Sequence, residues 1–106
     1  MNINNTQHLV YLNLQLPVRE LDWLLAALMA LLADDERLWV SQESEYGSKA
    51  QLHSSFEKVV GRARTVSMRL LCSAPRASKI LEGLMVKDKP MGIQWQIQPL
   101  MQTGEF

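Results

Sequence analysis

EKVVGRARTVSMRLLC, residues Glu57 to Cys72, carries the longest strand pattern of the chain and its only dense basic motif. From Val66 to Cys72, apolar side chains alternate with polar ones. This period of two is typical of a β-strand with one buried face. The stretch therefore predicts a central strand with one face toward the core and one open face.

Arg62 and Arg64 share the core-facing parity of this strand. Guanidinium groups are seldom buried without a partner. Either the hydrophobic cover of the sheet begins only at about Val66, or the two arginines meet an acidic or anionic partner. The second interpretation has two forms. The arginines could grip a ligand carboxylate or phosphate as bidentate forks, or close a salt bridge between subunits. Carboxylates that could supply the bridge are Glu57, Glu43 and Glu45.

Length and charge limit the class of protein. The 106 residues suffice for one domain, and we predict that residues 1–6 are disordered and that residues 7–106 form it. Eleven basic residues balance eleven acidic ones, so no net positive field would attract nucleic acid. The single cysteine, Cys72, excludes an internal disulfide, and the first residues lack an export signal. We expect a cytoplasmic protein.

Outward from the central strand, the chain alternates strand and helix patterns. The remaining predicted elements are a strand ending at Leu16, a helix from Pro17 to about Ala33, a strand over 37–45, a helix opening at 73–75, and a strand over 93–98. Residues 46–55 form a long loop rich in Gly and Ser. Gly83, inside the second helix, costs about 1 kcal/mol relative to alanine and indicates close approach of another backbone.

This order of elements is the split βαβ, ferredoxin-like plan. It predicts an α+β fold in which a four-stranded antiparallel sheet carries two helices on one face and the central strand lies between the first two strands. Leu38, Val40 and the alternating Ile93, Trp95 and Ile97 should face the helices.

The other face of the sheet should be polar and almost uncharged. Its predicted members are Tyr11, Asn13, Gln15, Trp39, Thr65, Ser67, Arg69, Gln94, Gln96 and Gln98. A monomer facing water would show more Lys and Glu, so this composition favours a partly wet interface between identical subunits. We predict an oligomer.

Several residues carry a resemblance to a known superfamily. They are Asp22, Trp23 and Leu24, then Glu57, Val60, Gly61, Arg62 and Arg64, and finally Trp95, Pro99 and Gly104. With them the chain resembles the PII-like (nitrogen regulatory protein-like) and CutA-like proteins, and within that group a bacterial domain-of-unknown-function branch. The resemblance implies the ferredoxin-like fold and a homotrimer whose sheets pack around an axis. Some members of the branch are associated with heavy-metal efflux genes, which implies a link to metal tolerance.

The resemblance gives no activity, and our hypothesis is a trimeric PII-like regulatory or signalling module that binds a small effector or a metal ion in clefts between subunits. Such a module would pass its state to a membrane transporter or another protein partner. A ligand-free structural or adaptor oligomer is the alternative. The expected ligand-binding residues are Arg62, Arg64, Glu43, Glu45, Lys87, Lys89, Gly92, Thr103 and Gly104.

The nucleotide site of PII proteins is matched only in part. Those proteins use a glycine-rich loop before the last strand and a basic segment ending in Arg, Thr, Gly and Glu. Here the loop has only Gly92, and Thr103–Glu105 match while the arginines are missing. Lys87 and Lys89 could hold an anion as point charges, or simply complement the helix dipole. We therefore expect no nucleotide sensing of the usual kind.

Metal binding and catalysis have weaker support. No Cys or His pair has ligand spacing, and Cys72 lies on the core parity. A metal site would need His53 together with Glu43, Glu45 or Met101. Ser54 and Ser55 are too close to His53 in the sequence to form a nucleophile–base pair. We expect no enzymatic activity and no cofactor.

Overall fold

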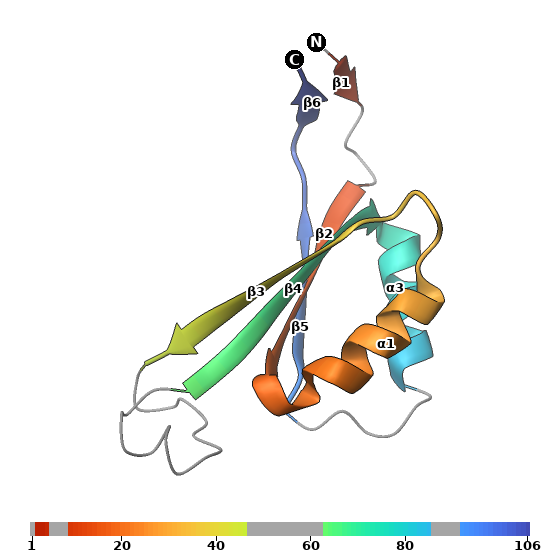
Figure 1. Ribbon diagram of the computed structural model, residues 1–106. Helices are drawn as coiled ribbons and strands as arrows, with labels where there is room; N and C mark the ends of the chain where they lie inside the picture. The colour runs from red at the N-terminus through yellow and green to blue at the C-terminus, as the bar shows by residue number, and fades with distance from the viewer. Residues whose placement is uncertain (1, 5–8, 47–62, 86–91) are drawn as a thin grey trace.

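The computed structural model describes residues 2–4, 9–46, 63–85 and 92–106. In chain order the elements are β1 (Asn2–Asn4), β2 (Leu9–Pro17), the 3-10 turn η1 (Val18–Glu20), α1 (Leu21–Leu31), β3 (Leu38–Glu45), β4 (Ala63–Ser73), α3 (Ala74–Met85), β5 (Gln94–Pro99) and β6 (Thr103–Glu105). β3, β4, β2 and β5 form the main sheet, and β1 pairs with β6 in a separate ribbon. Figure 1 shows both helices on the same side of the main sheet.

The predicted fold class is confirmed. Every neighbouring pair in the sheet is antiparallel, and β4 lies between β3 and β2, as expected of a central strand. Val66 and Met68 of β4 are fully buried. Arg64 is exposed, so the hydrophobic cover of the sheet begins at Val66.

The core lies between the two central strands and the two helices. α1 contributes Leu24 and Leu28 to it, and α3 contributes Ala77, Ile80 and Leu84. On β2, the buried positions alternate from Val10 to Leu16. Burying this continuous apolar layer is the main favourable term for folding.

The edge strands behave differently from the prediction. Val40 lies opposite Met68, and Trp95 lies opposite Leu14, so both are on the helix-facing side as expected. However, Val40 is 44% exposed and Trp95 is 49% exposed. β3 and β5 are the two edge strands of the main sheet, and neither contributes a fully buried residue to the core.

Two local predictions need correction. α1 ends at Leu31, two residues before the predicted end at Ala33. At Gly83, a Cβ would lie 3.2 Å from Cδ1 of Leu31, so the close neighbour is a side chain of α1 and not another backbone. Asn2–Asn4, within the stretch predicted to be disordered, pair with Thr103–Glu105. Antiparallel backbone pairing needs no side-chain periodicity, so the sequence pattern gave no sign of it.

None of the described helices is long and apolar enough to cross a membrane.

Candidate functional site

A cavity of about 340 Å³ lies at the end of the main sheet where β3 stops and β5 begins. We call it the polar cleft. Its lining includes Gln15, Glu43, Glu45, Tyr46, Thr65 and Gln94. Carboxylate, amide and hydroxyl groups therefore converge on one concave surface, as is common where small ligands bind.

Strand register explains how these side chains meet. Glu43 lies opposite Thr65, and Gln15 lies opposite Gln94, so all four strands contribute from the open face. The hydroxyl of Thr65 donates to the backbone carbonyl of Glu43 at 3.4 Å, across the pair of strands. Gly92, also in the lining, has a φ of 76°. This conformation favours glycine and lets the chain turn into β5.

The polar cleft unites part of the predicted ligand set. Glu43, Glu45 and Gly92 all line it. Arg64 lies opposite Ser44, on the other face of the sheet from Glu43. The strand register therefore does not place Arg64 and Glu43 in a cross-strand pair.

Other predicted ligand residues lie elsewhere. Thr103 and Gly104 belong to β6, which follows the opposite end of β5 from the polar cleft. The remaining members, Arg62, Lys87 and Lys89, lie outside the described residues.

The predicted metal set is not assembled by the described part of the chain. Met101 is 98% exposed and follows the end of β5, whereas Glu43 lines the polar cleft, which lies where β5 begins. His53 lies outside the described residues. Among described residues, no three His, Cys, Asp or Glu side chains gather in a metal-binding group.

The charge of the polar cleft differs from that of a phosphate site. Within the described lining, two carboxylates are present and no Lys or Arg. Carboxylates repel phosphate and attract cations, and the amides can hydrogen-bond either kind of polar group. The cleft thus suits a cation or a neutral polar molecule better than an anion.

A stack of cationic and aromatic side chains lies further along the open face. The Arg69 guanidinium lies over the Tyr11 ring, 4.8 Å from its centroid, and over the Trp39 ring, 5.7 Å from its centroid. Such contacts hold the guanidinium by its faces. Nearby, Asn13 Nδ2 donates to Gln98 Oε1 at 2.7 Å. We call Tyr11, Trp39 and Arg69 the open-face stack.

On the helix side, a smaller cavity of about 220 Å³ is lined by apolar side chains, among them Leu14, Leu81, Met85 and Trp95. We call it the apolar pocket. Its lining comes from β2, α1, α3 and the start of β5. Sequence patterning placed Trp95 in the core and so did not indicate this pocket.

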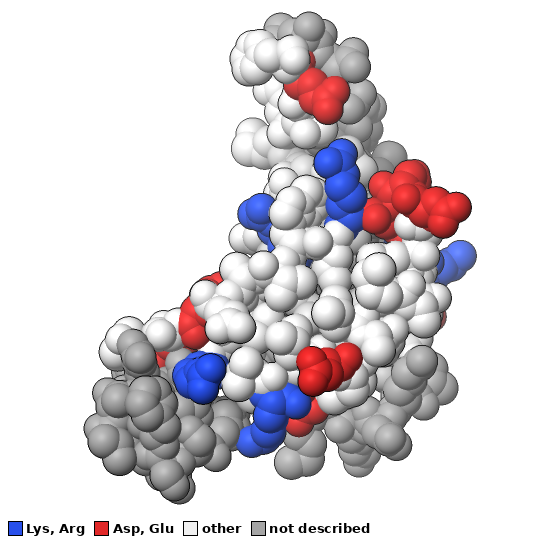
Figure 2. Space-filling view, in the orientation of Figure 1, with Lys and Arg blue, Asp and Glu red and all other residues white. Residues whose placement is uncertain are grey.

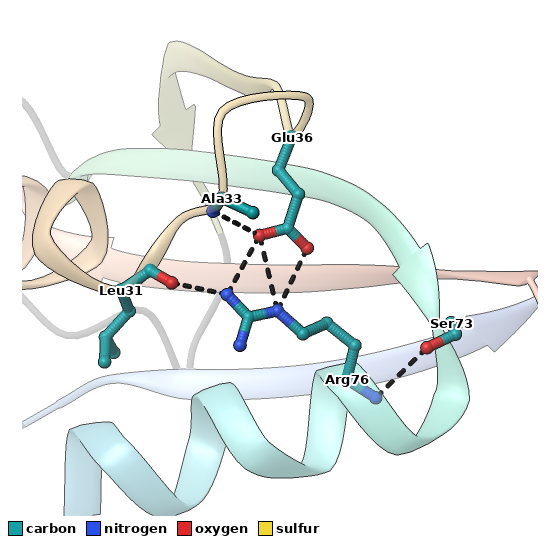
Figure 3. A network of polar contacts seen from close by, with 5 residues as sticks. All are labelled: Leu31, Ala33, Glu36, Ser73 and Arg76. Carbon is teal, nitrogen blue, oxygen red and sulfur yellow. Dashed lines mark hydrogen bonds and ion pairs between the residues drawn. The ribbon is translucent and has the colours of Figure 1, made fainter.

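A third feature ties the two helices together (Figure 3). Arg76 donates to both carboxylate oxygens of Glu36 and to the backbone carbonyl of Leu31, and Glu36 also accepts from the backbone N–H of Ala33. Hydrogen bonding from Arg76 lowers the pKa of the Glu36 carboxyl, and the same bond raises the pKa of Arg76. The guanidinium thereby satisfies a carbonyl at the end of α1.

The same region influences Cys72. Burial, and then the negative charge of Glu36, raise the pKa of its thiol. A raised pKa disfavours the reactive thiolate. Cys72 therefore packs as a small apolar side chain, in line with its predicted core parity.

The open-face stack and the Arg76–Glu36 pair were both missed by sequence reasoning. Glu36 lies between the predicted helix and the predicted strand over 37–45, where no sequence pattern singles it out. Arg76 is 40 positions away from Glu36, and no local signal connects them. The sequence pattern placed Tyr11, Trp39 and Arg69 on the correct face of the sheet. Which of these side chains lie next to one another depends on the register between strands, which the pattern does not reveal.

Charged side chains are scattered over the surface seen in Figure 2, and acidic and basic groups are interspersed. This agrees with the balanced charge of the sequence.

Comparisons with known proteins agree with this fold. A family model described as "Protein of unknown function (DUF3240)" matches residues 6–106. A comparison with curated proteins finds no match.

Similar solved structures include a DUF3240 family protein from Shewanella baltica, with 14% identity and a TM-score of 0.66, covering 97% of this chain and 99% of that one. CutA from Synechococcus elongatus has 14% identity and a TM-score of 0.58, covering 95% of this chain and 84% of that one.

A NIF3-related protein from Bacillus cereus has 14% identity and a TM-score of 0.63 over 96% of this chain, which spans only 27% of that longer protein. These identities are low, so the structures show a shared fold and nothing further. The match over nearly the whole sequence settles the family: this chain belongs to the DUF3240 family of proteins of unknown function and has a CutA-like α+β fold.

Proposed function

We propose that this protein is a PII-like regulatory or signalling module that works as a homotrimer and binds a small effector or a metal ion in clefts between subunits. The observation that carries the proposal is the polar cleft. It brings together Glu43, Glu45 and Gly92, three residues that the sequence predicts to bind ligand, around a cavity of about 340 Å³.

The open face supports the oligomer. Trp39 is 43% exposed there, and the strands around it carry amides and hydroxyls with few charges. The radius of gyration is 15.6 Å, against about 13 Å for a compact single domain of this length. An extended chain with uncovered aromatic groups fits a subunit of an assembly better than an isolated domain. The resemblance to PII-like and CutA-like proteins favours three copies.

The position of the polar cleft explains why copies would matter. Glu43, Thr65 and Gln94 all point from the open face, so another subunit packed on that face would close the cleft. Closure lowers the local dielectric and strengthens each polar contact with a ligand. A cation or a neutral polar effector suits the two carboxylates of the lining.

Transmission to a partner would begin at Tyr46. This residue lines the polar cleft directly after the end of β3. A ligand that contacts Tyr46 acts on the chain where the predicted 46–55 loop leaves the sheet. The expected partner is a membrane transporter or another protein, the expected compartment is the cytoplasm, and the expected role is binding without catalysis.

An adaptor oligomer that binds no small ligand is the second candidate, and a link to metal tolerance would suit either. The apolar pocket favours the adaptor. Met85 is 61% exposed and Trp95 is 49% exposed beside it, and exposed apolar groups of this size commonly mark protein contacts.

Light scattering and thermal-shift measurements on the purified chain test the proposal. Light scattering should give the mass of three chains. A thermal-shift screen of divalent metals, amines, carboxylates and nucleotides should find a compound that raises the melting temperature.

The rise should be lost in a double variant, Glu43→Gln with Glu45→Gln. Glu82→Gln, an exposed change on α3, is the matched control and should respond like the unaltered protein. A trimer that no compound stabilises would support the adaptor instead.

A further inference from the structure

We propose that Arg69 and its two symmetry copies form a binding site for a small tetrahedral oxyanion on the axis of the trimer. The inference rests on the proposed trimer, and it concerns the open-face stack rather than the polar cleft. The ligand proposed here is an anion, whereas the polar cleft suits a cation or a neutral polar molecule.

The first step is the fixed position of Arg69. Its guanidinium lies over two rings, those of Tyr11 and Trp39, at 4.8 Å and 5.7 Å from their centroids. A guanidinium carries five N–H donors, so contacts with two rings leave it able to donate to another group. Arg69 is exposed, so the N–H donors of its guanidinium can reach a group that packs on the open face.

The second step is that no carboxylate among the described residues pairs with this arginine. Within the described residues, the ion pairs are Arg19 with Glu20 and Arg76 with Glu36. On the open face the nearest acid along β3 is Glu43, four residues beyond Trp39, which lies opposite Arg69. At a rise of about 3.4 Å per residue, that separation is about 14 Å.

The third step is symmetry. Rotation about a threefold axis keeps each residue and its copies at the same height. We take the open faces to turn toward the axis with their strands running along it, so that Arg69 on a central strand faces its two copies and Glu43 of a neighbour stays about 14 Å away along the axis. A face-to-face twofold dimer could instead bring Arg69 of one copy to Glu43 of the other.

The fourth step is the charge that results. Guanidinium groups brought together in a partly dry interface repel one another, and burying them without a counter-charge is costly. An oxyanion with threefold symmetry, such as phosphate or sulfate, can offer one oxygen to each guanidinium. Asn13 and Gln96, which lie opposite each other beside Arg69, add neutral hydrogen-bonding groups.

The experiment compares anions at matched ionic strength. The melting temperature and the light-scattering mass of the full chain are measured in potassium chloride, with inorganic phosphate, sulfate or acetate as the added probe. Phosphate and sulfate should raise the melting temperature by about 3 °C or more over chloride, with little effect of acetate.

Arg69→Gln should abolish the rise while the mass stays that of a trimer. Arg69→Lys should keep a smaller rise, because an ammonium group is a point charge. Arg19→Gln, an exposed arginine in η1, is the matched control and should respond fully.

The outcomes separate this inference from the proposed function. A trimer whose melting temperature is the same in phosphate and chloride overturns the anion site and leaves the trimer standing. A phosphate response that survives Arg69→Gln overturns it as well. A monomer or a dimer at all concentrations overturns both proposals, since the axis would not exist.

Discussion

Arg76 Nη2 lies 2.9 Å from Oε1 of Glu36, and Arg76 Nε lies 3.1 Å from Oε2 of the same carboxylate. This two-point contact joins the start of α3 to the loop after α1. Only 12% of the Glu36 side chain is exposed, so solvent screens the pair less than it screens a surface salt bridge.

Glu36→Gln should destabilise the fold by about 1–3 kcal/mol, since it weakens hydrogen bonds to a charged and partly buried donor. Urea unfolding followed by circular dichroism measures the change. Asp35→Asn, at the exposed neighbouring position, is the control and should alter stability little. Equal stabilities of the two variants would contradict a structural role for the pair.

The pH dependence of stability should carry the same signature. Hydrogen bonding from Arg76 lowers the pKa of Glu36 in the folded state. Between the folded and unfolded pKa values the unfolded chain binds more protons, so the contribution of Glu36 is fully present above its unfolded pKa of about 4.3 and is lost as the pH falls through the folded pKa. Urea midpoints from pH 7 to pH 3 should fall more steeply for the unaltered protein than for Glu36→Gln. Parallel curves would exclude this linkage.

Gly83→Ala should stabilise α3 by less than the roughly 1 kcal/mol that helix propensity alone provides, because the new Cβ would crowd Leu31 at 3.2 Å. In a Leu31→Ala background, the same substitution should recover the full gain. A double-mutant cycle measures this coupling. Identical effects of Gly83→Ala in both backgrounds would show that Leu31 moves aside without cost.

Two side chains of one row across the sheet should respond very differently to truncation. Met68 is fully buried, and Met68→Ala should cost about 2–5 kcal/mol. Val40 lies opposite it but is 44% exposed, so Val40→Ala should cost under about 1 kcal/mol in the monomeric chain. Unfolding at concentrations low enough to suppress association provides the comparison. A large loss for Val40→Ala under these conditions would mean that the edge of the sheet is covered within one chain.

The sequence predicted the main sheet well because alternation from Val66 to Cys72 and from Val10 to Leu16 is strong and local. Core parity followed directly from it. Burial at the edges did not, because the exposure of Val40 and Trp95 depends on how far the helices extend over the sheet.

The candidate site was predicted only in part, for a related reason. Glu43 and Gly92 were identified individually, but register decides that they share a cleft and that Arg64 faces the other way. Contacts between positions far apart in sequence, such as Arg76 with Glu36, leave no periodic pattern that could reveal them.

The pairing of Ile3 with Gly104 places both marked chain ends at one end of the molecule, away from the helices (Figure 1). Dyes attached at Asn2 and Glu105 would therefore sit close enough for efficient energy transfer while the two-stranded ribbon is intact, and the signal would drop when it opens. Labels placed there are remote from Glu43 and Gln94, so ligand titrations could be followed optically without a chromophore beside the polar cleft.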